Sequence, residues 1–308
     1  MGPFLARRAL YSVFVVWGAV TVIFLLVRVI PGDPAALIGG PTATPEQIEA
    51  IARELGTREP LPIQYLRFLQ GAIMLDFGDS FRIGGSAISQ VFQKLPATAI
   101  LSFTAMLIAV VVSAPLGILA ARHPGTFIDR VVSRFSLIGQ SLPNFWVGLM
   151  LILLFSRQLR LLPSAGAESW QGIILPAVSL ALPLMSVLIR LVRGGLLEVL
   201  GEDYVRTARA KGLNENVVVY HHAVRNMLIP VVTVAGLQLG RLLGGTVVVE
   251  TVFAWPGIGR LLVDSIFARD FPVVQAAVAV IAVVFVFINL AVDLLYGRLD
   301  PRARVGGS

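Results

Sequence analysis

The residues best suited to chemistry lie in one polar stretch, Glu202 to Leu213, between two long apolar segments. Three basic side chains, Arg206, Arg209 and Lys211, fall within six positions of it. Basic residues that flank apolar segments are typical of the cytoplasmic side of a membrane. The chemistry open to this stretch is therefore charge pairing and contact with a partner.

Residue types predict a helix, a break and a second helix here. Ala208, Ala210 and the long basic side chains are good helix formers, and Gly212 suits a helix end or a sharp turn. Asn214 followed by Glu215 can start another helix. Two interpretations remain: an elbow that projects from the bilayer, or a charged loop that joins two membrane helices and sets topology.

Catalytic and metal-binding signatures are lacking elsewhere in the sequence. It contains no G-x-x-x-x-G-K-[S/T] phosphate loop, no H-E-x-x-H and no cysteine. His221 and His222 are adjacent, so on a helix they point about 100° apart. We therefore expect no enzymatic activity and no metal or cofactor bound by this chain. If transport uses ATP, the ATPase must be another polypeptide.

Composition places these residues in a membrane protein. The 308 residues are 56% hydrophobic and 14% charged, with a mean hydropathy of +0.82. Soluble domains carry about 25% charged residues. Six apolar runs approach the ~20 residues needed to cross a bilayer. These predicted spans are 9–31, 98–121, 135–156, 173–192, 229–250 and 273–295.

Lys and Arg counts predict that both termini face the cytoplasm. With the N-terminus inside, the inner segments hold thirteen such residues and the two short outer loops hold four. The long outer loop holds five more, but long loops translocate largely regardless of charge. The net charge of +7 is therefore explained by topology, since the basic residues are not gathered with aromatics on a nucleic-acid-binding face.

A long outer insertion, 32–97, is predicted to be helical. Thr44, Pro45 and Gln47 have the spacing of a capping box with proline in the first turn. A second amphipathic helix is expected after Pro60-Leu61-Pro62, and a third from Ser86 to Pro96. The insertion is either a cap packed on the helices or a segment with a function of its own.

Two further segments carry distinctive residues. Phe253-Ala254-Trp255-Pro256-Gly257-Ile258-Gly259 predicts a tight turn at the outer interface, where Trp255 can anchor. Asn289 and Asp293, one turn apart on the last span, must point into the protein or into a wet cavity. Structural, substrate-lining and subunit-interface roles remain open for them.

Together, these motifs resemble the permease subunits of ABC importers of the dipeptide, oligopeptide and nickel branch, most like the B-type dipeptide permeases. The resemblance rests on Tyr-Val-Arg-Thr-Ala-Arg-Ala-Lys-Gly at 204–212, on Pro-Gly-x-Gly at 256–259, and on Asn-Leu-x-Val-Asp-x-x-Tyr-x-x-x-Asp-Pro-Arg at 289–302. The general family pattern is Glu-Ala-Ala, three residues, then Gly. Aligned on Gly212, this chain has Arg206-Thr207-Ala208, so no role for that Glu carries over.

The resemblance implies an all-α integral membrane protein with the type I importer permease fold and a single domain, 1–308. It also implies a cytoplasmic coupling loop, 193–228, that docks on a separate ATPase, and an outer gate loop, 251–272. The implied ATPase-coupling residues are Tyr204, Arg206, Thr207, Ala208, Arg209, Ala210, Lys211, Gly212, Leu213, His221 and Arg225. The implied gate or pathway residues are Glu250, Phe253, Trp255, Pro256, Gly257, Gly259, Asn289 and Asp293.

The implied function is half of the translocation pathway of an ATP-driven importer for dipeptides or oligopeptides in a bacterial inner membrane. The implied partners are a second permease, two ATPase subunits that hold ATP and Mg²⁺, and an extracytoplasmic binding protein. Basic residues of the elbow are expected at the rim of the ATPase cleft, and Ala208, Ala210 and Leu213 inside it. The alternative is an ion-coupled secondary carrier, against which the sequence offers no ionisable relay at mid-membrane and no inverted repeat.

Overall fold

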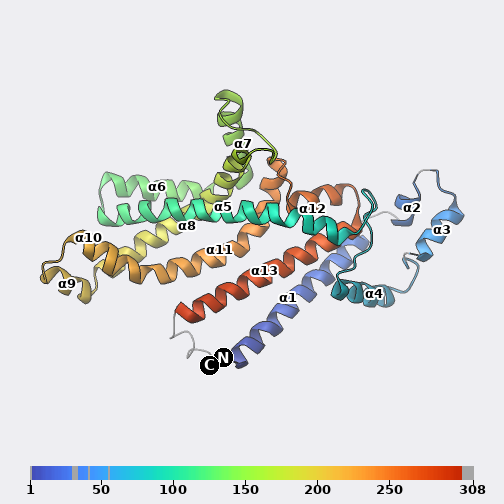
Figure 1. The fold of residues 1–308 in the computed structure, drawn as a ribbon, viewed down its shortest axis with the longest axis horizontal. Helices are drawn as coiled ribbons and strands as arrows, with labels where there is room; N and C mark the ends of the chain where they lie inside the picture. The colour runs from blue at the N-terminus through green and yellow to red at the C-terminus, as the bar shows by residue number, and fades with distance from the viewer. Residues whose placement is uncertain (1, 30–33, 41, 55, 300–308) are drawn as a thin grey trace. The chain divides into compact units, whose positions relative to one another are not determined.

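The computed structural model describes residues 2–29, 34–40, 42–54 and 56–299, and within these ranges the regular structure is helical (Figure 1). An isolated bridge joins Asp79 and Ser86. The all-α class predicted from the sequence is confirmed for these residues. The helices are α1 (Gly2–Val29), α2 (Pro34–Gly39), α3 (Pro45–Glu54), α4 (Leu61–Met74), α5 (Ala87–Arg122), α6 (Phe127–Ser141), α7 (Asn144–Leu151), η1 (Ile152–Gln158), η2 (Trp170–Ile173), α8 (Ile174–Leu200), α9 (Asp203–Ala210), α10 (Glu215–Val217), η3 (Val218–Ala223), α11 (Val224–Val252), α12 (Ile258–Phe267) and α13 (Phe271–Leu299).

Four helical segments are long and apolar enough to cross a membrane: Leu10–Val29, Ala87–Arg122, Trp170–Leu200 and Phe271–Leu294. Two bent pairs raise the number of possible spans to six if each pair is one span. The expected boundary at 31/32 and the terminal Asp300-Pro301-Arg302 lie outside the described residues.

The expected span 135–156 is not one straight helix. The chain forms α6 and then α7 with η1, and the two segments meet at 106°. The break falls at Leu142 and Pro143, both of which have extended backbone angles. A residue before proline is pushed out of the helical region, so the proline at 143 explains where the turn falls.

Pro96, in contrast, does not end a helix. The third amphipathic piece of the insertion was expected to stop there, but α5 runs unbroken from Ala87 to Arg122. Proline cannot donate the bond to the carbonyl four residues earlier, that of Phe92. Val91 before Pro96 and Thr98 and Leu101 after it are buried, and this tertiary packing overrides the local cost of a proline.

The start of the insertion follows the sequence prediction closely. Thr44 N donates to Gln47 Oε1 at 2.9 Å, and Gln47 N donates to Thr44 Oγ1 at 3.3 Å. This reciprocal pair is the predicted capping box, with Pro45 as the first residue of α3. A second helix, α4, begins after Pro60 as expected.

The chain divides into two compact units. Unit 1 comprises Met1–Pro96 and Gly257–Val286, and unit 2 comprises Ala97–Pro256 and Phe287–Ser308. In unit 1, Ile23 and Val27 of α1 pack with Phe271 and Val274 of α13. Asp270 is buried there and accepts from Ser80 Oγ at 2.5 Å and from Phe81 N at 3.1 Å. This carboxylate fixes the turn before α5 to the start of α13.

Helix α8 is the centre of unit 2. Its candidate span is 67% buried, whereas that of α1 is 17% buried. Leu180, Leu188 and Leu196, spaced eight residues apart, are all at most 1% exposed. They form a cluster with residues of α5, α6 and α11. Apolar packing on α8 therefore organises this unit.

A close approach between α5 and α8 generates the first prediction. A Cβ at Gly117 would lie 2.6 Å from Val192 Cβ and 3.0 Å from the carbonyl oxygen of Ile189. We expect Gly117→Ala to destabilise the chain by about 1–3 kcal/mol through overpacking. Gly194→Ala is the matched control, because nothing lies within 4 Å of its Cβ position. Thermal unfolding of the two detergent-solubilised variants tests this; equal stability contradicts the close approach.

Candidate functional site

The polar stretch forms an elbow, defined here as α9, the turn after it, α10 and η3. Val205 and Ala208, three residues apart, are buried against Val218. Val199 and Leu200 at the end of α8 pack against the same cluster. Apolar contacts thus fix the elbow to the end of α8, the most buried helix of unit 2.

The turn between the two elbow helices depends on Gly212. This residue has a φ of +76°, a conformation that side chains with a Cβ rarely adopt. Its amide donates to the carbonyl of Arg209 at 2.9 Å. Asn214 then starts α10, its side chain accepting from Asn216 N at 2.9 Å. The predicted order of helix, break and helix is confirmed.

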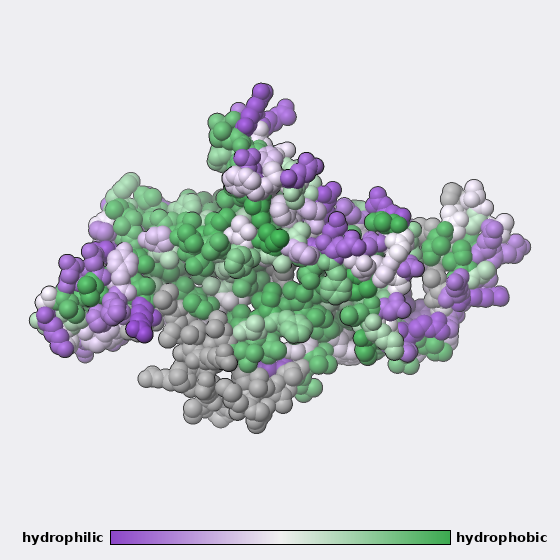
Figure 2. All heavy atoms as spheres, in the orientation of Figure 1, coloured by the Kyte–Doolittle hydropathy of each residue, from purple (hydrophilic) through white to green (hydrophobic). Residues whose placement is uncertain are grey.

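The outer surface of the elbow is charged. Arg209 donates to both carboxylate oxygens of Glu215, at 2.7 and 3.1 Å. This hydrogen bonding lowers the pKa of Glu215 below its ordinary value. A carboxyl group whose pKa is lowered by folding stabilises the folded chain at any pH above its ordinary pKa. The Arg209–Glu215 ion pair therefore contributes fully at neutral pH. That contribution is lost only when the pH falls through the lowered pKa of Glu215. Figure 2 shows hydrophilic residues gathered over α9 and α10.

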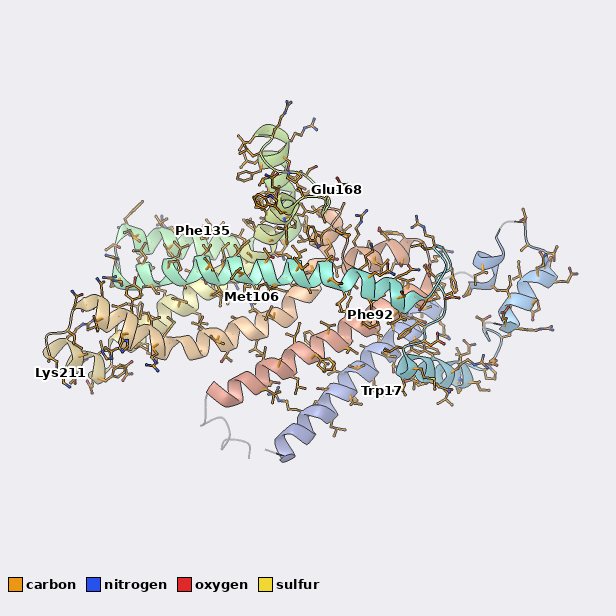
Figure 3. The ribbon with its side chains drawn as sticks, in the orientation of Figure 1. Trp17, Phe92, Met106, Phe135, Glu168 and Lys211 are labelled. Atoms are coloured by element: carbon orange, nitrogen blue, oxygen red, sulfur yellow. The ribbon has the colours of Figure 1, made fainter. Side chains whose placement is uncertain are left out.

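Most predicted coupling residues are exposed, all of them on the elbow except Arg225, which lies in the first turn of α11. Lys211 lies at the tip of the elbow in Figure 3. The exposed members are Tyr204, Arg206, Thr207, Arg209, Ala210, Lys211, Gly212, Leu213, His221 and Arg225. Ala208 is the exception, at 7% exposed, so it packs inside the elbow and is not available to fill a partner's cleft. The apolar side chains that remain accessible include Tyr204, Leu213 and Tyr220.

An ion pair that the sequence analysis missed ties the same region together. Arg193 of α8 donates to both oxygens of Asp129 on α6, at 2.5 and 2.8 Å. Asp129 is nearly buried, and it also accepts from Gly125 N at 2.9 Å and from Ser133 Oγ at 3.3 Å. The carboxylate thus joins the loop after α5, the first turn of α6 and the last third of α8.

Local sequence holds a signal for Asp129 that was not used. Thr126 caps α6 and accepts from Asp129 N, and an acidic residue in a first helical turn is expected from the helix dipole. Its partner lies 64 residues further on, among several Arg residues that were assigned to topology. Only the packing of α6 on α8 brings the two groups together.

Three of the predicted gate residues in unit 2, Glu250, Phe253 and Trp255, form a buried junction. Glu250, at the end of α11, is fully buried and accepts from Thr98 Oγ1 at 2.7 Å. Trp255 N donates to the carbonyl of Glu250 at 2.8 Å, and Trp255 Nε1 donates to that of Ala97 at 2.9 Å. Trp255 was expected to anchor at the interface, but it is 6% exposed and points to α5.

Phe253 completes this junction. It is 1% exposed, its carbonyl accepts from Gly166 N at 2.9 Å, and its ring would lie 2.9 Å from a Cβ at Gly148 of α7. Glycine at 148 therefore permits the ring to pack on α7. The end of α11 is held by α5, by α7 and by the loop before α8, with Pro256 half-buried at the unit's edge.

The remaining predicted gate residues lie in other places. In unit 1, Gly257 precedes α12 as its N-cap, and Gly257 and Gly259 are buried. In unit 2, Asn289 and Asp293 are half-buried one turn apart on α13, and both take part in polar interactions. Among the described residues, no group of three or more His, Cys, Asp or Glu could hold a metal ion.

Two family descriptions match the chain. One is "Binding-protein-dependent transport system inner membrane component", over residues 113–305. The other is the N-terminal region of such a membrane component, over residues 1–102. Together they span nearly the whole sequence.

Curated relatives match over most of their length. A probable peptide ABC transporter permease of Sinorhizobium fredii is 43% identical over 99% of this chain and 100% of its own. The glutathione transport system permease GsiC of Escherichia coli K12 is 44% identical over 92% of each chain.

Solved structures share the fold. The inward-facing MetNI methionine ABC transporter aligns with a TM-score of 0.57 and 22% identity, over 68% of this chain and 96% of that chain. An amino acid ABC transporter crystallised with histidines aligns with a TM-score of 0.55 and 17% identity, over 68% and 94%. The type I importer permease fold expected from the sequence is therefore confirmed.

The Asp129–Arg193 pair generates the second prediction. In a double-mutant cycle of Asp129→Asn and Arg193→Gln, we expect a coupling energy of about 1–2 kcal/mol, typical of charge-assisted hydrogen bonds with some solvent access. Thermal unfolding in detergent provides the measurement. The exposed pair Glu49 and Arg53 is the control, and its cycle should give at most about 0.5 kcal/mol. Equal coupling in the two cycles contradicts a structural role for Asp129.

Proposed function

The chain belongs to the family of inner membrane components of binding-protein-dependent transport systems, and from this premise we propose that it moves dipeptides or oligopeptides as one permease of an ABC importer. The cargo is supported by relatives named for peptide and glutathione transport. The coupling role is supported by the structure of the elbow: its charged residues are exposed, and its buried apolar residues pack against the end of α8. In this proposal the elbow docks on a separate ATPase subunit.

The docking surface combines charge with a few apolar side chains. Arg206 and Lys211 are exposed and reach the rim of an ATPase cleft, while Tyr204 and Leu213 supply apolar contact. Ala208, buried within the elbow, keeps α9 seated on η3 and α8. The ATP and Mg²⁺ belong to the ATPase, because this sequence carries no phosphate loop.

The structure supports a specific route for the movement. A displacement of the elbow reaches α8 through Val205, Ala208 and Val218, since these side chains pack against the end of that helix. The Asp129–Arg193 pair then carries it to α6. ATP favours one of two states of the helices, and the cavity switches from outward-facing to inward-facing access. Two discrete packings of α8 with its neighbours are the physical requirement.

The outer end of the pathway is assigned to the junction of Glu250, Phe253 and Trp255. All three are buried and bonded or packed within unit 2, so opening this end requires that these contacts break together. Gly257 and Gly259 lead the chain onwards into α12. Asn289 and Asp293 line the pathway or a subunit interface.

The complete importer in this proposal contains a second, similar permease, two ATPase subunits and an extracytoplasmic binding protein. Both termini of this chain face the cytoplasm, because the Lys and Arg residues are concentrated in the inner segments. The elbow lies on the same side, as docking on a cytoplasmic ATPase requires.

The test is gentle purification of the chain from its native membrane, with the co-purifying subunits identified by mass. ATP hydrolysis by the eluate is then measured with and without dipeptides and longer peptides. We expect a second permease and ATPases whose activity rises with peptide and binding protein. A chain that purifies alone and transports peptide under an ion gradient would instead establish the secondary carrier.

Gly212 provides the third prediction. No atom lies within 4 Å of a Cβ placed at Gly212, so we expect the effect of Gly212→Val to come from the positive φ, which costs a residue with a Cβ about 1–2 kcal/mol. We expect the variant to insert and assemble normally but to hydrolyse ATP without peptide uptake. Uptake per ATP in proteoliposomes gives the coupling ratio.

Gly212→Asn is the matched control, because asparagine tolerates this backbone conformation. It should retain most of the coupling that valine loses. If the valine variant transports peptide with an unchanged coupling ratio, the elbow is not the coupling element.

A further inference from the structure

Helix α4 carries an apolar surface that no described part of the chain covers. None of its residues is buried. Leu66 is 65% exposed and Ile73 is 84% exposed, and at 100° per residue they lie within about 20° of each other around the helix. Pro62 lies on the same side, and Met74, 68% exposed, borders it.

Polar residues lie on another side of α4, where Arg67 is about 100° and Gln64 about 160° from Leu66 around the helix. Arg67 forms an ion pair with Glu59 at 2.7 Å. Gln64 accepts from Arg28 Nη2 at 2.7 Å and donates to the carbonyl of Glu59 at 2.7 Å. Between these two sides, a third side faces α1. The helix therefore has a protein-facing side, a polar side and an exposed aliphatic side.

Contacts with α1 fix where α4 lies. The Tyr65 hydroxyl is 2.7 Å from Thr21 Oγ1. The rings of Tyr65 and Phe68 lie 5.1 and 5.2 Å from the ring of Phe24. Figure 1 shows α4 beside the C-terminal half of α1, and both helices belong to unit 1.

These contacts reach into the depth of the membrane span. The apolar segment of α1 is Leu10–Val29, so Thr21 lies eight residues before its end. At 1.5 Å per residue, this is about 12 Å below the end of the span. Arg28, one residue from the end, is where the polar side of α4 bonds. Helix α4 therefore lies beside the part of α1 that runs from Thr21 to Arg28.

We propose that α4 is an interfacial membrane helix, whose Leu66 and Ile73 side is buried in lipid at the C-terminal end of α1. Interfacial helices bury an apolar side about 5–10 Å into the boundary between head groups and acyl chains and keep their polar side in the head groups. Contacts at the level of Thr21 and Phe24 place the aliphatic side of α4 at that depth. Arg28, Arg67 and Gln64 meet the head-group layer.

This assignment changes the interpretation of the insertion. The segment was expected either to cap the helices or to have a function of its own, and neither interpretation says what covers the aliphatic side of α4. Lipid is favoured because α1 is a membrane span, and the inference depends on that property and not on the cargo or on ATPase docking. With the N-terminus inside, the leaflet involved is the outer one.

Spin labelling tests the proposal, and the chain contains no native cysteine to remove. Leu66→Cys, Ile73→Cys and, on the polar side, Arg67→Cys are each labelled with a nitroxide in the full chain with its co-purifying subunits. The complexes are placed in vesicles of phosphatidylethanolamine and phosphatidylglycerol. Collision of each nitroxide with oxygen, which concentrates in lipid, is compared with collision with a water-soluble nickel chelate.

We expect the oxygen-to-nickel ratio to exceed one at positions 66 and 73 and to reverse at position 67. Nickel access at 66 and 73 equal to that at 67 overturns the proposal in favour of a water-exposed insertion. Low access to both reagents at 66 and 73 also overturns it, because a protein partner then covers this side. Neither result bears on whether the chain is an importer permease, which the purification tests separately.

Discussion

The bidentate contact between Asp129 and Arg193 is the constraint on which the elbow end of unit 2 depends. The buried carboxylate of Asp129 is tolerated because Gly125 N and Ser133 Oγ, besides the guanidinium, donate to it. Such a pair adds little net stability compared with apolar packing, because both groups lose hydration. Its contribution is geometric, since two parallel hydrogen bonds admit one orientation of α6 on α8. The orientation of α8 in turn fixes that of the elbow, because Val199 and Leu200 at the end of α8 pack against the buried residues of the elbow.

The same logic extends to the opposite end of unit 2. Glu250 and Trp255 bond to Thr98 and Ala97, which begin the part of α5 that follows Pro96. One polar contact set therefore holds α5 to α11 at one end, and another holds α6 to α8 at the other. Between them lies an apolar core that includes Leu180, Leu184 and Leu188 of α8.

Sequence reasoning succeeded where structure is local. The Thr44 and Gln47 capping box, the turn at Gly212 and the long apolar helices all follow from residues within a few positions of one another. It failed where tertiary contacts decide. Pro143 breaks its span while Pro96 does not, Ala208 turns inward, and Asp129 meets an arginine 64 residues away. Periodicity cannot distinguish these outcomes, because each depends on which helix packs opposite.

The division of unit 1 into two stretches of chain has a consequence for the order of synthesis. Met1–Pro96 leaves the ribosome long before Gly257–Val286, and the whole of Ala97–Pro256 is made between them. Ile23 and Val27 therefore cannot pack on Phe271 until the end of the chain has been made. The hydrogen bond of Ser80 likewise forms only after Asp270, 190 residues later, has been synthesised. The N-terminal helices enter the membrane first, yet the core that they share with α12 and α13 is completed only after most of unit 2 has been made. Any delay or truncation near Gly257 leaves the earliest part of the chain without its packing partners.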